Sequence, residues 1–349
     1  MSKISRWTKQ ISQSGKEMIR DVSTVISGIR EFKRNGQTPD DAYFSMRRLY
    51  RTTNGRFNDV IGQICRIKHR KQQADLTTSL FESANRAETR EIAARIQQDG
   101  FYQFPRKLPL SLCDQLLEFA STTPGRPISL DAQPQDLEVF NRSNPSTVRH
   151  QFQPEDLILQ PVVGQLATDP YFFDIAQHYL GFNPVLDQLT MWWSAPGDVQ
   201  LQSRAAQLYH FDMDRFRFVK FFVYLTDVHE KNGPHCYVRG SHLRKPKQLL
   251  RDERISDDEI SQHYASDDLV ELTGQRGTML AVDTRGFHKG KPLTEDDRLI
   301  FQLQFADSLF GQNYPSLEIP NGLSQDTALR IASNQRCYGS YLVSKNGTH

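Results

Sequence analysis

The sequence predicts a mainly β fold, in which a double-stranded β-helix or jelly roll forms the core and an α-helical region precedes it. Strand-like runs separated by turns fill the second half of the chain, at residues 184–193, 217–225, 235–239, 278–282 and 298–305. The first 98 residues instead carry apolar side chains at helical spacing. Polar residues in two of the strand regions would face inward, toward the core.

The composition is that of a soluble globular protein with one large domain and an appendage: 349 residues, 38% hydrophobic and 24% charged. No apolar run approaches the roughly 18 residues that cross a bilayer, and the N-terminus lacks the apolar core of a secretory signal. We therefore expect a cytoplasmic protein without a transmembrane segment. The cysteines lack CxxC spacing and predict buried, reduced thiols rather than a zinc site or disulfides: Cys65, Cys113, Cys236 and Cys337.

Charge is distributed unevenly along the chain. Residues 1–71, the basic head, contain 16 Lys and Arg against 6 Asp and Glu, a balance of +10 that leaves −8 for the remainder. Such a head predicts an acidic partner: an anionic membrane surface, a nucleic acid or the acidic body of the chain. The basic cluster 66–71 has no interleaved aromatic residues, so a nucleic acid is not favoured. A homo-oligomer formed through the head is a further alternative.

Helices are predicted for most of the N-terminal region. Residues 1–34 have an apolar stripe beside a basic face, which fits a helix packed on a neighbour or a second subunit better than an interfacial membrane helix. Turn and capping residues then separate further helices at 39–50, 57–71 and 75–98. We place a domain boundary near residue 85, so that residues 1–85 are a basic helical region and residues 86–349 are the β-helix domain. The second part is expected to fold without the head.

The region after Asp99-Gly100 enters the β-rich domain. A short strand at 101–105 and a helix beginning near Ser111 come first. Residues 122–160 predict long loops, in which Arg142 and Arg149 are either solvated or placed to meet an acidic group of a substrate. A helix is expected at 169–179, and residues 244–274 predict an insertion that contains a short helix.

The pattern that carries chemistry is His210-Phe211-Asp212. Alternation along a strand puts the imidazole and the carboxylate on one face, as two ligands of a 2-His-1-carboxylate metal site would require. The alternative is an ordinary pair of polar neighbours, but none of the other nine histidines has an acidic residue two places on. His288 is the candidate third ligand. The turn at 289–297 would pair the flanking strands as a hairpin and bring the carboxylate-binding guanidinium of Arg298 near the metal.

An ordered set of motifs gives the segment from about residue 90 to 310 a family resemblance. The set is His210-Phe211-Asp212, Leu225-Thr226-Asp227, Asn232-Gly233-Pro234, Gly240-Ser241-His242, His288 and Arg298. In this order it resembles the phytanoyl-CoA dioxygenase-like family of Fe(II)/2-oxoglutarate oxygenases, which have a cupin-like core.

The resemblance implies both a site and a reaction. His210, Asp212 and His288 would bind Fe(II), Arg298 would pair with the C5 carboxylate of 2-oxoglutarate, and O2 would take the last position. The expected reaction is hydroxylation of a C–H bond in a small-molecule, carrier-linked, lipid-linked or glycan-linked substrate, with release of succinate and CO2. Related iron halogenases lack the carboxylate ligand, so Asp212 favours a hydroxylase.

Some residues depart from the family pattern or compete with the assigned ones. Gly290 stands where many members have Ser or Thr, and Arg298 follows His288 by ten residues where eleven is frequent. Asp214 is a competing carboxylate that we expect in the following turn. His242 is expected to be structural.

Two other functional classes stay open at the level of sequence. One is a cupin-like binding or scaffold protein with an inactive metal site. The other is a metal-dependent enzyme of a different reaction type, such as an isomerase.

Overall fold

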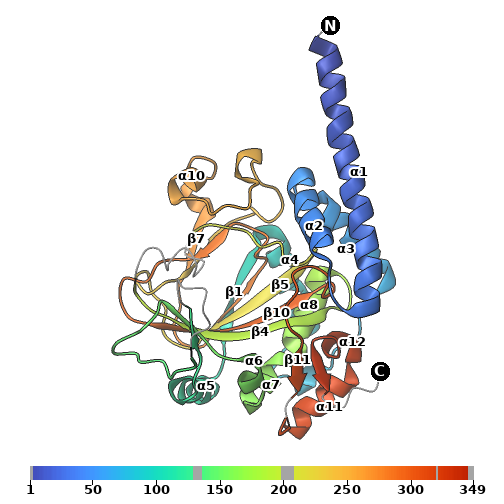
Figure 1. Ribbon diagram of the computed structural model, residues 1–349. Coiled ribbons are helices and arrows are strands. Elements are labelled where there is room, and N and C mark those ends of the chain that lie inside the picture. The colour runs from blue at the N-terminus through green and yellow to red at the C-terminus, as the bar shows by residue number, and fades with distance from the viewer. Residues whose placement is uncertain (1–2, 129–135, 198–207, 320, 345–349) are drawn as a thin grey trace.

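A seven-stranded antiparallel sheet lies at the centre of the molecule, with the strand order β1-β8-β5-β10-β4-β3-β2 (Figure 1). The computed structural model describes residues 3–128, 136–197, 208–319 and 321–344, and of residues 3–14, 343 and 344 only the backbone. The strands of this large sheet are β1 (Phe101–Lys107), β2 (Arg126–Pro127), β3 (Arg149–Gln151), β4 (Val185–Ser194), β5 (Phe218–Tyr224), β8 (Thr278–Val282) and β10 (Arg298–Ala306).

A second, three-stranded antiparallel sheet has the strand order β7-β6-β9. Its strands are β6 (His235–Val238), β7 (Leu269–Leu272) and β9 (His288–Gly290). A parallel pair near the C-terminus, β11 (Leu317–Ile319) and β12 (Leu342–Ser344), completes the described strands.

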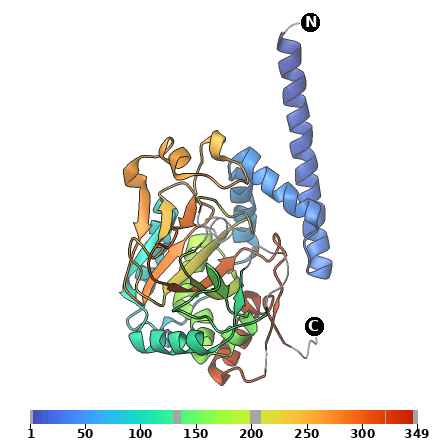
Figure 2. The same ribbon diagram turned by 60° about the vertical axis from the view of Figure 1, so that its left-hand side comes forward.

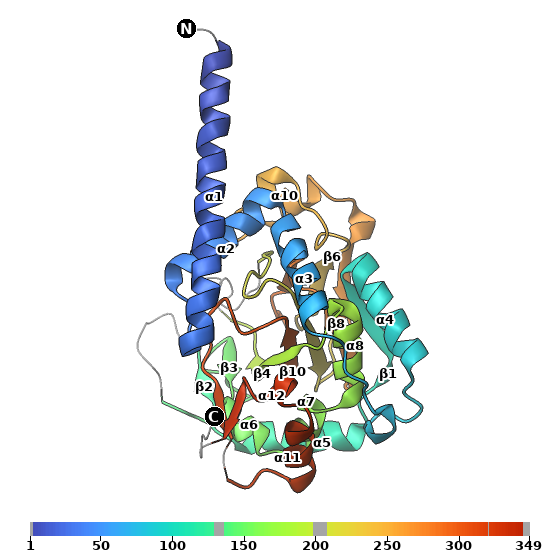
Figure 3. The ribbon, with the colours of Figure 1, turned by 90° about the vertical axis from the view of Figure 1, so that its right-hand side faces the viewer.

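Helices cover the outer face of the large sheet. Leu303 of β10 lies opposite Leu189 of β4 and Phe221 of β5, and all three side chains are buried. The ring of Phe221 packs 5.0 Å from that of Phe172 on α8 (Pro170–Leu180), and α4 (Arg86–Asp99) lies beside α8 (Figure 3). This face is apolar, so it needs a helical cover to exclude water.

Most of the remaining helices lie in the N-terminal region or around the lower end of the sheet, and one lies at the upper end near β7 (Figure 1). They are α1 (Lys3–Asn35), α2 (Asp40–Thr53), α3 (Arg56–Lys68), α5 (Leu110–Thr122), α6 (Pro154–Ile158), α7 (Pro161–Ala167), α10 (Asp257–Ser261), α11 (Gln325–Ser333) and α12 (Gln335–Tyr338). The N-terminal half of α1 projects beyond the rest of the molecule (Figure 2). Among the described residues, no helix is both long and apolar enough to cross a membrane.

The N-terminal helices pack directly on the β-rich part of the chain. Met46 and Leu49 of α2 are buried in one apolar cluster with Phe216 and Phe310. Tyr50 stacks on Phe211 with ring centroids 5.7 Å apart. The domain boundary near residue 85 stays a prediction. The contacts of α2 with Phe211, Phe216 and Phe310 connect residues on the two sides of this boundary.

Three expectations need correction. The term mainly β is imprecise, because helices occupy more of the described chain than strands do. The strands on either side of His288 do not pair as a hairpin: β5 lies between β8 and β10, and β9 pairs with β6 in the smaller sheet. The single helix predicted at 75–98 is a 3-10 turn followed by α4, because the side chain of Asn85 accepts hydrogen bonds from the backbone of Ala87 and Glu88 and starts a new helix there.

Candidate active site

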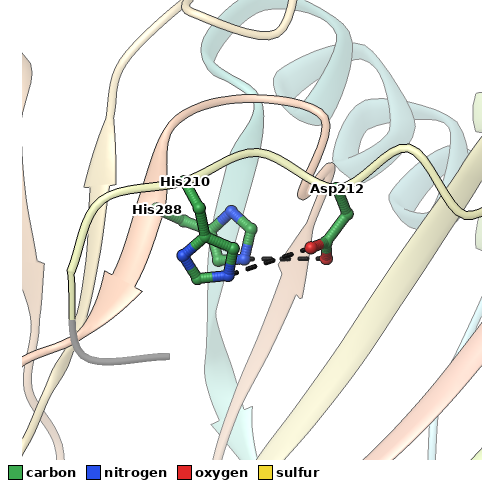
Figure 4. A group of neighbouring side chains, drawn as sticks. All are labelled: His210, Asp212 and His288. Atoms are coloured by element: carbon green, nitrogen blue, oxygen red, sulfur yellow. Dashed lines mark ion pairs between the residues drawn. The ribbon is translucent and has the colours of Figure 1, made fainter. Parts of the chain in front are cut away.

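The structure brings His210, Asp212 and His288 together between the two sheets (Figure 4). His210 and His288 form an isolated antiparallel bridge, in which each backbone N–H donates to the other's carbonyl at 3.0 and 2.9 Å. The backbone N–H of Asp212 donates to the carbonyl of Thr284 at 2.8 Å. Two extended segments distant in sequence therefore hold the three side chains through main-chain hydrogen bonds.

The donor atoms of these side chains point toward one another. Nε2 of His210 lies 3.8 Å from Oδ1 of Asp212, and Nε2 of His288 lies 3.7 Å from Oδ2. One donor atom from each residue falls within 4.8 Å of the others, and the imidazole centroids are 4.3 Å apart. Such spacing suits three ligands of one metal ion, since metal–nitrogen and metal–oxygen bonds are about 2.0–2.2 Å long.

The backbone fixes which imidazole nitrogen faces the centre. Nδ1 of His210 lies 2.8 Å from the carbonyl oxygen of Leu208, and Nδ1 of His288 lies 3.0 Å from that of Gly286. A carbonyl only accepts, so each Nδ1 carries the proton and donates it. Both Nε2 lone pairs are then free to bind a metal, which is the usual arrangement around metal-bound histidines.

Burial sets the charge of the three groups. It lowers the pKa of His210 to about 4 and that of His288 well below its ordinary value, so both rings are neutral at neutral pH. Burial alone would raise the pKa of Asp212, but the positive charge of Lys220 and its hydrogen bond to the carboxylate outweigh burial and hold that pKa far below the usual range. Two neutral imidazoles and one carboxylate suit a divalent cation.

Lys220 is a site residue that sequence reasoning missed. Its Nζ donates to Oδ2 of Asp212 at 2.7 Å, and its side chain is only 10% exposed. The signal in the sequence is a single lysine in the otherwise apolar strand Phe218–Tyr224, all of which is buried. A charge in such a strand needs a buried partner.

Arg298 opens β10 at the opposite end of the site. Its Nη2 donates to Oγ of Ser194 at 3.2 Å, and its buried Nε has no partner among the described residues. A Cβ built on Gly290 would lie 3.4 Å from the same Nη2, so the strand that follows His288 runs beside the guanidinium. No carboxylate of the described residues forms an ion pair with Arg298.

A cavity of about 600 Å³ connects the three donors to Arg298. Its floor is formed by side chains from β3, β4, β5 and β10 of the large sheet, and β6 and β9 close the other side. Buried His235 lines it, with its ring 5.5 Å from that of His288 and its Nε2 without a partner in the described chain. Unpaired polar atoms in a cavity mark places where a ligand would bind.

The competing residues lie outside the group of three donors. Asp214 lines the cavity from the bend that follows the His210 segment, where burial and the charge of Asp212 raise its pKa to about 6. His242 faces the carbonyl of Gln97 at 3.1 Å, and Cys236 is buried and free. Arg142 forms an exposed ion pair with Asp297 and does not line the cavity.

Solved structures similar to this chain include SnoN, EctD and HygX. The non-heme alpha ketoglutarate dependent epimerase SnoN from nogalamycin biosynthesis is 19% identical, with 64% of this chain and 84% of that chain covered and a TM-score of 0.46. EctD from S. alaskensis with bound Fe is 18% identical, with coverage of 71% and 88% and a TM-score of 0.44. HygX from Streptomyces hygroscopicus, with nickel, 2-oxoglutarate and hygromycin B bound, is 17% identical, with coverage of 68% and 93% and a TM-score of 0.41.

Comparison with individual curated proteins and comparison with family profiles gave different results. No curated protein matches the chain. The profile described as phytanoyl-CoA dioxygenase (PhyH) matches residues 96–300, which is more than half of the chain and includes His210, Asp212, His288 and Arg298. The chain therefore belongs to the phytanoyl-CoA dioxygenase (PhyH) family of Fe(II)/2-oxoglutarate-dependent oxygenases.

Proposed function

We propose that this protein is a non-haem Fe(II)/2-oxoglutarate-dependent dioxygenase that hydroxylates a C–H bond of a small-molecule, carrier-linked, lipid-linked or glycan-linked substrate. The observation that carries the proposal is the convergence of His210 Nε2, His288 Nε2 and the Asp212 carboxylate within 4.8 Å. Three protein ligands on one side of a metal leave positions open for a co-substrate and O2.

The residues fit the metal in charge as well as in spacing. Both imidazoles present a lone pair, because their Nδ1 protons are held by backbone carbonyls, and the one carboxylate supplies negative charge. With 2-oxoglutarate and O2, the bound iron would supply the oxidising chemistry that converts 2-oxoglutarate and a substrate C–H into succinate, CO2 and an alcohol.

Arg298 would position the co-substrate. Its guanidinium is buried, bonded only to Ser194 and free of any anionic partner in the described chain. A planar fork of donors matches a carboxylate, so we infer that it receives the C5 carboxylate of 2-oxoglutarate. The apolar walls that Phe222 and Ile300 contribute would keep water from the reacting atoms.

The choice of hydroxylation rests on Asp212. An enzyme that binds chloride at the metal replaces this carboxylate with a small residue, and the acid is present here.

We also infer that the large and small sheets, which face each other across the cavity, form the two layers of a double-stranded β-helix. The basic head would serve association, as a dimer or by packing on the acidic body rather than on lipid. We infer a cytoplasmic location.

The test is the stoichiometry of the co-substrate reaction. Purified protein should form succinate from 2-oxoglutarate only when Fe(II) and O2 are both present, and His288→Ala should form none. An inactive binding protein would form no succinate under any of these conditions. A metal-dependent isomerase that does not use 2-oxoglutarate would convert its substrate without forming succinate.

A further inference from the structure

A second arginine, the half-buried Arg149, lines the same cavity as Arg298. Arg149 of β3, Ser194 of β4 and Arg298 of β10 lie directly opposite one another in register. Two strand spacings of about 4.8 Å therefore separate the backbones of the two arginines. Nothing in the proposed chemistry of Fe(II) and 2-oxoglutarate requires a second guanidinium at that distance from the first.

The guanidinium of Arg149 is held in place but carries no counter-charge. It lies over the ring of Trp192 at 4.4 Å from the centroid, and its Nη2 donates to Oε1 of Gln151 at 3.1 Å. Its Nε is buried without a hydrogen-bond partner, and no carboxylate in the described parts of the chain forms an ion pair with it. Burial and the nearby charge of Arg298 lower the pKa of Arg149 to about 10, so it is still charged at neutral pH.

The unpaired polar atoms of the cavity fall into two groups. Arg298 Nε and His235 Nε2 lie on the side of β10 and β6, where the co-substrate is proposed to bind. Arg149 Nε and Thr190 Oγ1 lie on the side of β3 and β4. Thr190 and Trp192 lie on the same face of β4, because residues two apart in a strand share a face.

We propose that this second group is the substrate site, in which Arg149 binds a carboxylate of the substrate while its carbon skeleton lies along Trp192 and Thr190. The inference rests on the proposed function and adds the class of substrate, a carboxylic acid. The guanidinium is already oriented by Trp192 and Gln151, so little conformational freedom is lost when the carboxylate binds. The C–H to be oxidised then lies between Trp192 and the three metal ligands.

Arg142 provides a matched control, because it lies over the neighbouring tryptophan of β4, which faces the opposite side of the strand. It also lies over a tryptophan, Trp193, at 5.0 Å, but it is paired with Asp297 and lies outside the cavity. Arg149→Gln and Arg142→Gln make the same chemical change, and each removes a guanidinium from a tryptophan face. Only the first removes it from the cavity.

The experiment is a calorimetric titration of the full chain, loaded with Fe(II) and 2-oxoglutarate under anaerobic conditions. The probes are straight-chain and aromatic monocarboxylic acids and their primary amides. At least one acid should bind about tenfold or more tightly than its amide, and Arg149→Gln should abolish that preference, because a charge-assisted hydrogen bond is lost. Arg142→Gln should keep the preference, and Arg149→Lys should restore part of it.

Three results would overturn the inference. The first is that no acid binds more tightly than its amide. The second is that Arg149→Gln keeps the preference for the acid. The third is that Arg149→Gln weakens the binding of 2-oxoglutarate by the same factor as Arg298→Ala. The last result would assign Arg149 to the co-substrate. Failure of the proposed function can be distinguished from failure of the inference about Arg149. In the first case the wild-type protein would not bind 2-oxoglutarate together with Fe(II). Titrations of the metal-free protein with the acids and amides would still report on Arg149.

Discussion

Lys220 Nζ lies 2.7 Å from Oδ2 of Asp212, and both side chains are largely buried. In the absence of a metal this lysine is the main positive charge that faces the carboxylate, since both neighbouring imidazoles are neutral. A divalent metal bound to Asp212 would take over part of that role. The stability of the protein and its affinity for metal should therefore be linked through this pair.

We predict that Lys220→Met destabilises the metal-free protein by about 3–5 kcal/mol, because it leaves a buried carboxylate without its partner. Mn(II) should raise the melting temperature of this variant more than that of the wild type. Thermal unfolding with a chelator and with Mn(II) measures both values. Equal metal-induced shifts in the two proteins would show that Lys220 does not balance the charge of Asp212.

His210→Ala, Asp212→Ala and His288→Ala should each abolish retention of Fe(II) while the fold persists, because three ligands leave none to spare. The matched control is Asp214→Ala, which removes a carboxylate two residues away that is not part of the group. Metal content after desalting and far-ultraviolet circular dichroism measure the two properties. If Asp214→Ala lost the metal and Asp212→Ala kept it, the ligand assignment would be wrong.

Arg298→Ala should weaken 2-oxoglutarate binding by about 2–5 kcal/mol, roughly 30- to 5,000-fold, since one partner of a buried charge-assisted pair is lost. Arg298→Lys should recover only part of this, because an ammonium group offers no planar fork. The dependence of succinate formation on 2-oxoglutarate concentration gives the values. An unchanged Michaelis constant in Arg298→Ala would remove Arg298 from the site.

Asp307 should make the stability of the fold fall as pH rises through the acid range. Burial raises its pKa to about 7, and Oδ1 accepts a hydrogen bond from the backbone N–H of Arg217 at 3.3 Å. Between about pH 4 and pH 7 the folded chain holds a proton that the unfolded chain has lost, so the free energy of unfolding decreases by up to about 1.4 kcal/mol per pH unit. The contribution of protonated Asp307 to the free energy of unfolding is fully present below about pH 4.

Asp307→Asn should remove this pH dependence, because the amide cannot ionise but can still accept from Arg217. Urea unfolding at a series of pH values, compared between the two proteins, measures it. The variant should be the more stable of the two near neutral pH. A constant difference between the proteins at all pH values would mean that Asp307 ionises normally in the folded state.

Tyr50 of α2 supports the segment that carries two of the ligands. Its ring stacks on Phe211, its hydroxyl donates to the carbonyl of Arg285 at 3.3 Å, and Lys245 Nζ donates to that hydroxyl at 2.9 Å. Tyr50→Ala should cost about 3–5 kcal/mol of stability and weaken Mn(II) binding, whereas Tyr50→Phe, which loses only the hydroxyl contacts, should cost about 1 kcal/mol. Equal Mn(II) affinity in Tyr50→Ala and the wild type would show that α2 does not support the site.

The same contacts change the expectation for the head. The sequence suggested that a chain without it would fold, but removing α2 and α3 would expose Phe211, Phe216 and Phe310 to water. We now expect a chain that begins near Asp75 to melt well below the full chain or to aggregate. An equal melting temperature would contradict this and would support independent folding of residues 86–349.

Local patterns were enough to predict the candidate ligands. His210 and Asp212 are two residues apart in an extended segment, and His288 and Arg298 flank a turn rich in polar residues. The structure places all four around one cavity. For His210 and Asp212 the period of a strand was sufficient, whereas the hairpin that was expected to bring Arg298 near His288 does not form, and Arg298 reaches the cavity because β10 pairs with β4 and β5.

Non-local packing decided what the sequence did not reveal. The salt bridge between Lys220 and Asp212 depends on where β5 lies in the sheet, and β5 lies between β8 and β10, two strands that are distant from it in sequence. Arg149 was placed in a long loop, yet it is held in β3 by hydrogen bonding to β4. No residue near any of these positions in the sequence encodes the partner.

We expect His210, Asp212 and His288 to bind one Fe(II) ion that also binds 2-oxoglutarate. Anaerobic addition of Fe(II) and 2-oxoglutarate to the purified chain should produce a weak visible charge-transfer band, because the co-substrate would chelate the metal at the positions that a 2-His-1-carboxylate site leaves open. The band should be absent in His288→Ala and present in His242→Ala, since His242 faces Gln97 instead of the cavity. A wild-type protein that binds Fe(II) but gives no band with 2-oxoglutarate would contradict the assignment of these three residues to a 2-oxoglutarate-binding iron site.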